Sequence, residues 1–168
     1  MDKNKAINIL KEAILLERRG KAFYAQAAAT TQSEAARRIF TMMSEEEDEH
    51  IHYLTTQFQH FMQYEEFVKP EPPAHDSHEE VAMKVLSEDF KKQVNAAGFE
   101  AAAIAAAMDF EMRAVKVYAD RAAETDDPKE KELYMILADW EKGHHEILKR
   151  LNDELKESIW HDNQFWPF

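Results

Sequence analysis

The sequence contains no cysteine among its 168 residues, so disulfide bonds, thiolate metal sites and the usual iron–sulfur clusters are excluded for this chain. Glycine and proline are scarce, at three and five residues, which favours long uninterrupted helices. No uncharged apolar run approaches the roughly 18 residues of a membrane span. The N-terminal residues lack a signal-peptide core. We therefore expect a soluble, cytoplasmic protein.

Basic residues are outnumbered, with 21 Lys and Arg against 33 Asp and Glu, and the net charge is -12. Such a surface repels nucleic acids and anionic membranes, so neither is an expected partner. Hydrophobic residues still make up 45% of the chain, enough for one domain with a substantial core.

The chain repeats itself at an offset of 94 residues. Glu47-Asp48-Glu49-His50 returns as Glu141-Lys142-Gly143-His144, and without any gap Glu17 aligns with Glu111. Self-similarity at a fixed offset indicates a duplicated structural unit. Each copy carries a Glu followed 30 residues later by a Glu-x-x-His.

Apolar residues recur at three- and four-residue spacing over four segments, which predicts four amphipathic helices. These helices span about residues 3–30, 34–65, 96–124 and 128–158. Ser33 and Asp127 are predicted to cap the second and fourth helices. The methionines at helical spacing are expected in the core: Met42, Met43, Met108, Met112 and Met135.

Residues 66–95 form a predicted crossover between the second and third helices. Closely spaced prolines break the helical pattern there, and Ser77 with Glu80 makes a capping box for a short helix over residues 78–92. Two short-turn hairpins joined by one long crossover predict an all-α four-helix bundle over residues 1–159.

Residues 160–168 form an aromatic C-terminal tail. Large apolar side chains gain roughly 1.5–3 kcal/mol each on burial. We therefore expect the tail to pack on the bundle or on a partner subunit, most simply in a homodimer.

Residues equidistant from the turn of an antiparallel hairpin lie at the same depth. The midpoint of Glu17 and Glu47 is residue 32, in the first turn, and the corresponding midpoint in the second repeat is residue 126. Each glutamate pair therefore lies at one level, roughly 20 Å from its turn. We expect six side chains to meet at mid-bundle: Glu17, Glu47, His50, Glu111, Glu141 and His144.

Four buried carboxylates without counter-ions would each cost several kcal/mol. Two divalent ions would balance their charge and leave both imidazoles neutral. One Glu from each of two helices and Glu-x-x-His from each of the other two is the arrangement of di-iron and di-manganese carboxylate bundles. We therefore predict a two-metal site with these six residues as ligands. Two iron ions are expected, with manganese or zinc as substitutes.

Two further pairs of repeat-equivalent residues lie near the expected site. Tyr24 and Tyr118 each follow a ligand glutamate by seven residues, so their hydroxyls lean back toward the metal level. They either hydrogen-bond to ligand carboxylates or are core tyrosines with other partners. Glu46 and Trp140 precede the ligand glutamates, so any supporting role at that position is asymmetric.

These residues resemble the rubrerythrin-like members of the ferritin-like superfamily. The match comprises Glu17, Phe23-Tyr24-x-x-Ala27-Ala28 and Glu47-x-x-His50, echoed by Glu111, Tyr118, Ala122 and Glu141-x-x-His144. The resemblance covers the four helices and implies a ferritin-like fold with a non-haem di-iron site. It also implies an oxidoreductase that reduces hydrogen peroxide or dioxygen with electrons from a donor.

Two departures from the family pattern matter. Many rubrerythrins carry a rubredoxin-type domain whose iron is held by four cysteines, and without cysteine this chain needs an external electron donor protein. Ala114 stands one turn after Glu111, where those proteins carry an additional Glu, so ligand exchange during peroxide reduction is affected.

Three alternatives remain open at this stage. A ferroxidase that handles iron would share these ligands and would need a closed shell of many subunits for storage. Oxygen and imidazole ligands also suit manganese, as in a dimanganese catalase. The last alternative is a metal-free interaction bundle.

Overall fold

The computed structural model describes residues 3–69, 93–94 and 98–162, with side chains described up to residue 157. These residues form four long helices and no strand, which confirms the predicted all-α fold. The helices are α1 Lys3–Thr30, α2 Glu34–Tyr64, α5 Phe99–Glu124 and α6 Pro128–Asp162. The predicted helix over residues 78–92 and the last residues of the predicted tail lie outside the described residues. None of the described helices is both long and apolar enough to cross a membrane.

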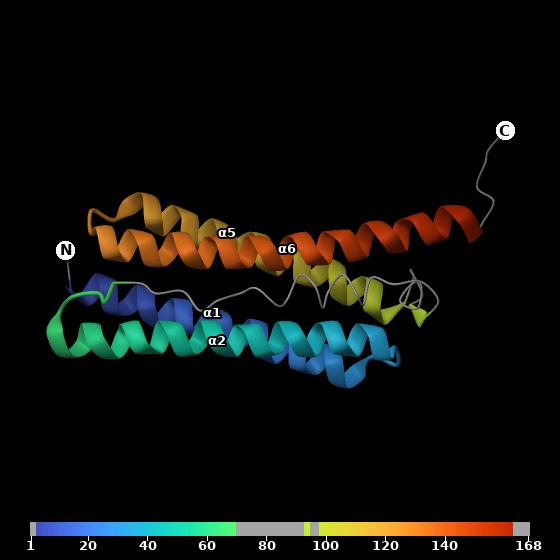
Figure 1. The fold of residues 1–168 in the computed structure, drawn as a ribbon, viewed down its shortest axis with the longest axis horizontal. Helices are drawn as coiled ribbons and strands as arrows, with labels where there is room; N and C mark the ends of the chain where they lie inside the picture. The colour runs from blue at the N-terminus through green and yellow to red at the C-terminus, as the bar shows by residue number, and fades with distance from the viewer. Residues whose placement is uncertain (1–2, 70–92, 95–97, 163–168) are drawn as a thin grey trace.

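The four helices form two antiparallel hairpins, because α1 packs along α2 and α5 packs along α6. The two hairpins lie against each other with their turns at opposite ends of the molecule (Figure 1). Helix α2 therefore runs parallel to α5, so a long connection rather than a short turn joins the two hairpins. This is the four-helix bundle with one long crossover.

The predicted helix caps are both formed. The backbone of Ser33 is extended, and its side-chain oxygen accepts a hydrogen bond from the backbone N–H of Ala36 at 3.1 Å. Asp127 Oδ1 accepts hydrogen bonds from the backbone N–H groups of Lys129, at 2.9 Å, and Glu130, at 3.1 Å. Each cap satisfies donors that the first helical turn leaves without an intrahelical partner. The caps fix where each hairpin turns, and so set the level of the residues at mid-bundle.

We expect Asp127→Ala to destabilise the protein by about 1 kcal/mol, because two backbone donors at the start of α6 lose their acceptor. For a domain of this size that loss corresponds to a fall in Tm of about 2–4 °C. Thermal unfolding followed by circular dichroism measures the change. Asp126→Ala, at the exposed neighbouring position, is the control. Equal effects of the two variants would contradict the capping role.

A polar layer divides the core into two apolar clusters. Along α2, Met43 belongs to one cluster and Leu54 to the other, with Glu47 and His50 between them. Helix α6 shows the same order in reverse, from Leu137 through Glu141 and His144 to Leu148. The six residues predicted to meet therefore lie between two packed apolar regions that exclude water from both sides.

The ends of two helices differ from the prediction. Helix α5 begins at Phe99 rather than near residue 96, with Gly98 as its N-cap. Helix α6 continues to Asp162, beyond the predicted end near residue 158. Between Gly143 and Pro167 the sequence has neither glycine nor proline, and Lys149 pairs with Asp153 one turn on at 2.9 Å. Nothing in this segment stops the helix where the apolar pattern fades.

Two of the five methionines expected in the core are exposed. The side chains of Met112 and Met135 are 50% and 52% exposed, whereas Met42 and Met43 are buried. Met112 follows Glu111 by one residue and therefore points about 100° away from the inward face of its helix. Met135 follows the buried Tyr134 in the same way. The prediction was wrong for these two residues because it used their helical spacing without considering which face of the helix they occupy.

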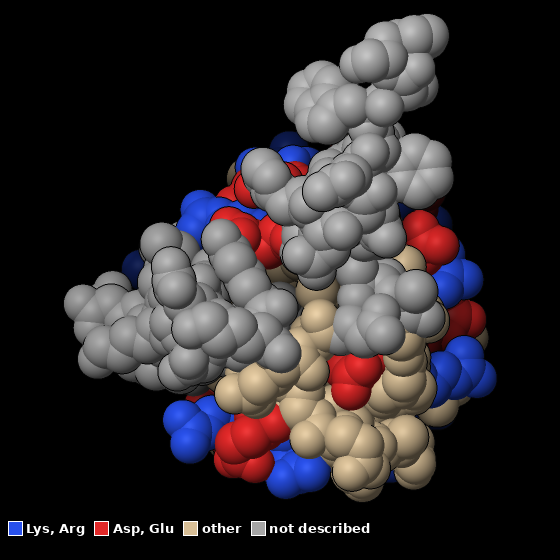
Figure 2. All heavy atoms as spheres, turned by 90° about the vertical axis from the view of Figure 1, so that its right-hand side faces the viewer, with Lys and Arg blue, Asp and Glu red and all other residues tan. Residues whose placement is uncertain are grey.

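The surface mixes charges of both signs. Figure 2 views the end of the bundle that carries the α1–α2 turn, and acidic and basic side chains lie next to one another on the part of this end that is not grey. Lys21 pairs with Asp48 between the two helices at 2.5 Å, and Arg37 pairs with Glu34 at 3.0 Å. Exposed pairs of this kind contribute roughly 0–1 kcal/mol each.

Candidate metal centre

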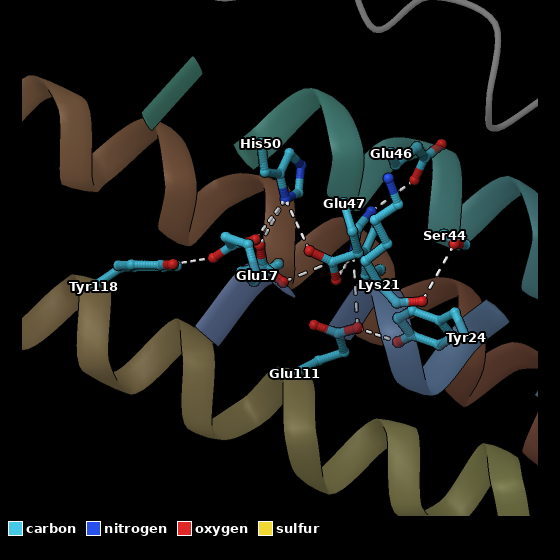
Figure 3. Close-up of polar contacts among 11 residues, drawn as sticks. Glu17, Lys21, Tyr24, Ser44, Glu46, Glu47, His50, Glu111 and Tyr118 are labelled. Atoms are coloured by element: carbon cyan, nitrogen blue, oxygen red, sulfur yellow. Dashed lines mark hydrogen bonds and ion pairs between the residues drawn. The ribbon is translucent and has the colours of Figure 1, made fainter. Parts of the chain in front are cut away.

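All four helices contribute to one polar layer at mid-bundle. Helix α1 supplies Glu17 and α5 supplies Glu111, while α2 and α6 each supply a glutamate and a histidine. Every one of the six side chains is at least 96% buried, and they are Glu17, Glu47, His50, Glu111, Glu141 and His144. Figure 3 shows the carboxyl groups of the first hairpin and of Glu111 converging below His50.

The six side chains form two overlapping groups of metal-ligating atoms. The first group joins Glu17 and His50 to Glu47 and Glu141, and the second joins Glu111 and His144 to the same two glutamates. Within each group the ligating atoms lie within 4.8 Å of one another. Glu47 and Glu141 therefore belong to both groups, whereas each histidine belongs to one. This arrangement is typical of two ions that share bridging carboxylates.

Both histidines direct the same ring nitrogen toward the layer. His50 Nδ1 lies 3.0 Å from Glu17 Oε2 and 3.0 Å from Glu141 Oε1. His144 Nδ1 lies 3.7 Å from Glu111 Oε1 and 3.7 Å from Glu141 Oε2. Atoms that bind one ion at about 2.0–2.2 Å must lie at separations of this order from one another. The geometry therefore allows one ion beside each imidazole.

Several buried polar atoms of the layer have no hydrogen-bond partner among the described residues. They include both carboxylate oxygens of Glu47, both of Glu141, Glu111 Oε2 and His144 Nδ1. A buried polar atom left without a partner costs roughly 1–3 kcal/mol. Two cations bound between these atoms would satisfy all of them at once. The residues present therefore fit a pair of metal ions.

The pKa values of residues in the layer show that its buried carboxylates repel one another when no metal is bound. Burial, followed by repulsion from Glu141, raises the pKa of both Glu17 and Glu47 well above the usual value. Burial acts to lower the pKa of His50, but the charge of Glu141 and close contacts of the ring with Glu141 and Glu47 raise that pKa to about 9. Without metal, protons thus partly neutralise the layer, and divalent ions would take their place.

Two buried tyrosines connect the hairpins to each other at this level. The Tyr24 hydroxyl donates a hydrogen bond to Glu111 Oε1, and the Tyr118 hydroxyl donates one to Glu17 Oε1. The carboxylates of both hairpins are therefore held from opposite sides (Figure 3). Each tyrosine binds the glutamate of the other hairpin rather than the one on its own helix. Burial, followed by the charge of Glu111, raises the pKa of Tyr24, so its hydroxyl keeps its proton and remains a donor.

Sequence reasoning missed the role of Gly20, which lies one turn after Glu17 at the repeat position of Ala114. A Cβ atom at Gly20 would lie 2.8 Å from Glu47 Oε1 and 3.0 Å from Phe110 Cε1. The absence of a side chain therefore leaves room for the shared carboxylate of Glu47. Helical periodicity places Gly20 on the inward face, but it does not reveal that a carboxylate from α2 approaches it so closely.

We expect Gly20→Ala to weaken metal binding by about 10-fold, because the new methyl group displaces the Glu47 carboxylate. The metal-free protein should not lose stability, since alanine favours a helix over glycine by about 1 kcal/mol. Gly143→Ala is the matched control, because a Cβ there meets no atom within 4 Å. Anaerobic Fe(II) titration and thermal unfolding of both variants test this. Equal metal affinities of Gly20→Ala and Gly143→Ala would refute the role of Gly20.

A four-helix bundle that encloses two overlapping Glu/His groups belongs to the class of carboxylate-rich two-metal bundles. Comparison with known families agrees, since the rubrerythrin family model matches residues 8–152. The chain therefore belongs to the rubrerythrin family, as its motifs indicated. Membership implies a di-iron carboxylate protein that acts on peroxide or dioxygen. No curated protein and no solved structure gives a match to the chain.

Proposed function

We propose that this protein is a di-iron oxidoreductase that reduces hydrogen peroxide or dioxygen with electrons from a separate donor. The observation that supports this most is the pair of overlapping Glu/His groups sharing Glu47 and Glu141. In this proposal Glu17 and His50 would hold one iron, Glu111 and His144 would hold the other, and Glu47 and Glu141 would serve both. Carboxylate and imidazole ligands suit iron, and they also suit manganese and zinc. Family membership favours iron among these metals.

When bound, the iron pair supplies the two electrons that peroxide reduction requires and polarises the O–O bond. The chain's own residues hold and shield that pair. Tyr24 and Tyr118 each donate a hydrogen bond to one carboxylate oxygen, of Glu111 and of Glu17, and so keep both carboxylates in one orientation. The apolar clusters on either side exclude water, which strengthens every electrostatic interaction within the layer. No side chain needs to act as a nucleophile.

Ala114 occupies the position at which many rubrerythrins carry an additional glutamate. It is 1% exposed, belongs to an apolar cluster beside the layer, and lies one turn after Glu111, where the family pattern has an additional carboxylate. The ligand set is therefore the symmetric one, with one glutamate and one Glu-x-x-His from each hairpin. We propose that turnover is slower than in rubrerythrins that carry this additional glutamate.

The rival functions make different use of the same ligands. A ferroxidase would pass its oxidised iron on to a store, and a dimanganese catalase would convert peroxide to water and dioxygen without any reductant. In the proposed function the iron stays in place through each cycle. The fate of the metal and the release of dioxygen therefore distinguish the three.

The test is a single-turnover experiment on protein loaded anaerobically with Fe(II). Peroxide is added, and bound iron is measured after desalting while an oxygen electrode records dioxygen. We expect about two irons per chain before and after the reaction, and no dioxygen. Iron lost from the chain or collected as mineral would instead support ferroxidase activity. Dioxygen release from the manganese-loaded protein would support a catalase.

A further inference from the structure

The two halves of the polar layer differ at one repeat position, occupied by Glu46 in α2 and Trp140 in α6. Each residue contacts the histidine of the opposite hairpin. Glu46 Oε2 lies 2.6 Å from His144 Nε2. The Trp140 ring stacks on the His50 ring, with centroids 4.7 Å apart and planes inclined by 12°. The repeat is thus symmetric in its six ligating residues and asymmetric in what supports its two histidines.

Glu46 sets the state of the His144 ring. When Nδ1 of His144 binds a metal ion, the ring hydrogen is on Nε2, which can then donate a hydrogen bond to Glu46 Oε2. The opposite nitrogen, Nδ1, is the one that faces Glu47, Glu111 and Glu141. A carboxylate on the far nitrogen of a ligating histidine fixes its orientation and makes it a stronger donor to metal.

The contact between Glu46 and His144 is buried. Burial raises the free-energy cost of the Glu46 carboxylate and strengthens its electrostatic effect on His144. Glu46 is 3% exposed and His144 is 4% exposed. A carboxylate buried this deeply costs several kcal/mol unless a charged or strongly polar partner compensates for it. In the polar layer it also adds a fifth carboxylate to a group that already repels itself. A metal ion bound beyond His144 would supply positive charge that compensates for this carboxylate.

We infer that Glu46 is a positioning residue that makes the His144 side of the centre the stronger of two unequal metal positions. This inference rests on the proposed function, since it assumes that metal binds the layer. Trp140 fixes the orientation of His50 by stacking but adds no negative charge. The ion beside His144 therefore binds first and more tightly, and the ion beside His50 second. Centres with unequal positions load stepwise.

The test isolates each position with a matched variant and uses Co(II) as the probe. Glu17→Gln disables a ligand used only beside His50, and Glu111→Gln disables one used only beside His144. Glu46→Gln is then added to each background, with Glu45→Gln, at the exposed neighbouring position, as control. Anaerobic titration followed in the visible spectrum gives the Co(II) affinity and the ligand-field bands of each position.

We expect Glu46→Gln to weaken Co(II) binding by about 10–100-fold and to shift the Co(II) bands in the Glu17→Gln background. In the Glu111→Gln background the affinity should change by less than about twofold. Glu46→Asp, which keeps the charge but shortens its reach, should give a smaller loss and serves if the glutamine variant does not fold. Equal losses in both backgrounds, or no loss in either, would overturn the inference. Failure of the unmodified protein to bind two Co(II) ions would overturn the proposed function itself.

Discussion

Glu47→Gln is expected to abolish the binding of both metal ions while leaving the fold intact. Glu47 belongs to both groups of ligating atoms, so its loss removes a shared ligand from each position. We expect the affinity for each ion to fall by about 100-fold or more, since even supporting residues around a metal typically account for 10–100-fold. Glu17→Gln, which affects one group only, should retain about one ion per chain.

The fold should survive this change because protonation of Glu47 is favoured in the metal-free protein. Burial, followed by the charge of Glu141, raises the pKa of Glu47, so its ionised form is disfavoured in the metal-free protein. Glutamine has the shape of the protonated carboxyl group and carries no charge. The metal-free variant should therefore melt at or slightly above the temperature of the metal-free parent.

Metal analysis and thermal unfolding with and without Fe(II) measure both consequences. Metal at 100 times its Kd stabilises a protein by about 2.7 kcal/mol per site, a rise in Tm of about 5–10 °C. The parent should show this rise and Glu47→Gln should lose it. Glu49→Gln, on the exposed side of the same helix, is the control and should behave as the parent. A Glu47→Gln protein that still holds two ions would remove the basis for shared ligation.

The second large effect concerns the supply of electrons. Reduction of hydrogen peroxide follows H₂O₂ + 2 e⁻ + 2 H⁺ → 2 H₂O, and a pair of Fe(II) ions holds two electrons. The chain has no cysteine with which to build a rubredoxin-type iron site. We therefore expect the isolated, Fe(II)-loaded protein to consume about one peroxide per chain and then stop. Consumption should resume, by many turnovers, when a reduced redox protein is added.

The net charge of the protein predicts which electron-donor proteins associate with it fastest. With a net charge of -12, the protein should associate fastest with a donor that carries a basic docking face. The rate with such a donor should fall as salt rises, because the Debye length shortens from about 30 Å at 0.01 M to about 10 Å at 0.1 M. Stopped-flow kinetics with one basic and one acidic donor measure this dependence. Sustained peroxide loss with no reductant present would contradict the proposed electron supply.

Much of the fold and of the candidate site followed from two sequence signals. The ungapped repeat located the glutamates and histidines, and the turn positions placed Glu17 level with Glu47. Local chemistry at Ser33 and Asp127 fixed the starts of two helices. These signals depend on spacing along one helix or across one short turn, where geometry is nearly independent of the rest of the chain.

Contacts between the hairpins were beyond the reach of the same reasoning. Tyr24 binds Glu111 and Tyr118 binds Glu17, and these exchanges depend on how one hairpin is seated on the other. The contact between Glu46 and His144 has the same origin. Depth from a turn fixes a residue's level but not its neighbour across the bundle. Only the packed structure decides which side chain faces which.

The second limit of the sequence-based prediction was the helix face on which a residue lies. Met112 and Met135 share the helical spacing of core residues but lie one position away from the inward stripe. One residue corresponds to about 100° around a helix, enough to move a side chain from core to solvent. Gly20 shows the opposite case, since its inward position was evident while its close approach to Glu47 was not.

Iron-edge anomalous diffraction from crystals grown anaerobically with Fe(II) tests the two-metal centre. We predict two anomalous peaks per chain at mid-bundle, one beside Glu17 and His50 and the other beside Glu111 and His144. Both should lie within ligating distance of Glu47 and Glu141. A bundle that shows iron only at surface carboxylates, with no peak among these six residues, would contradict the assignment of this layer as a metal centre.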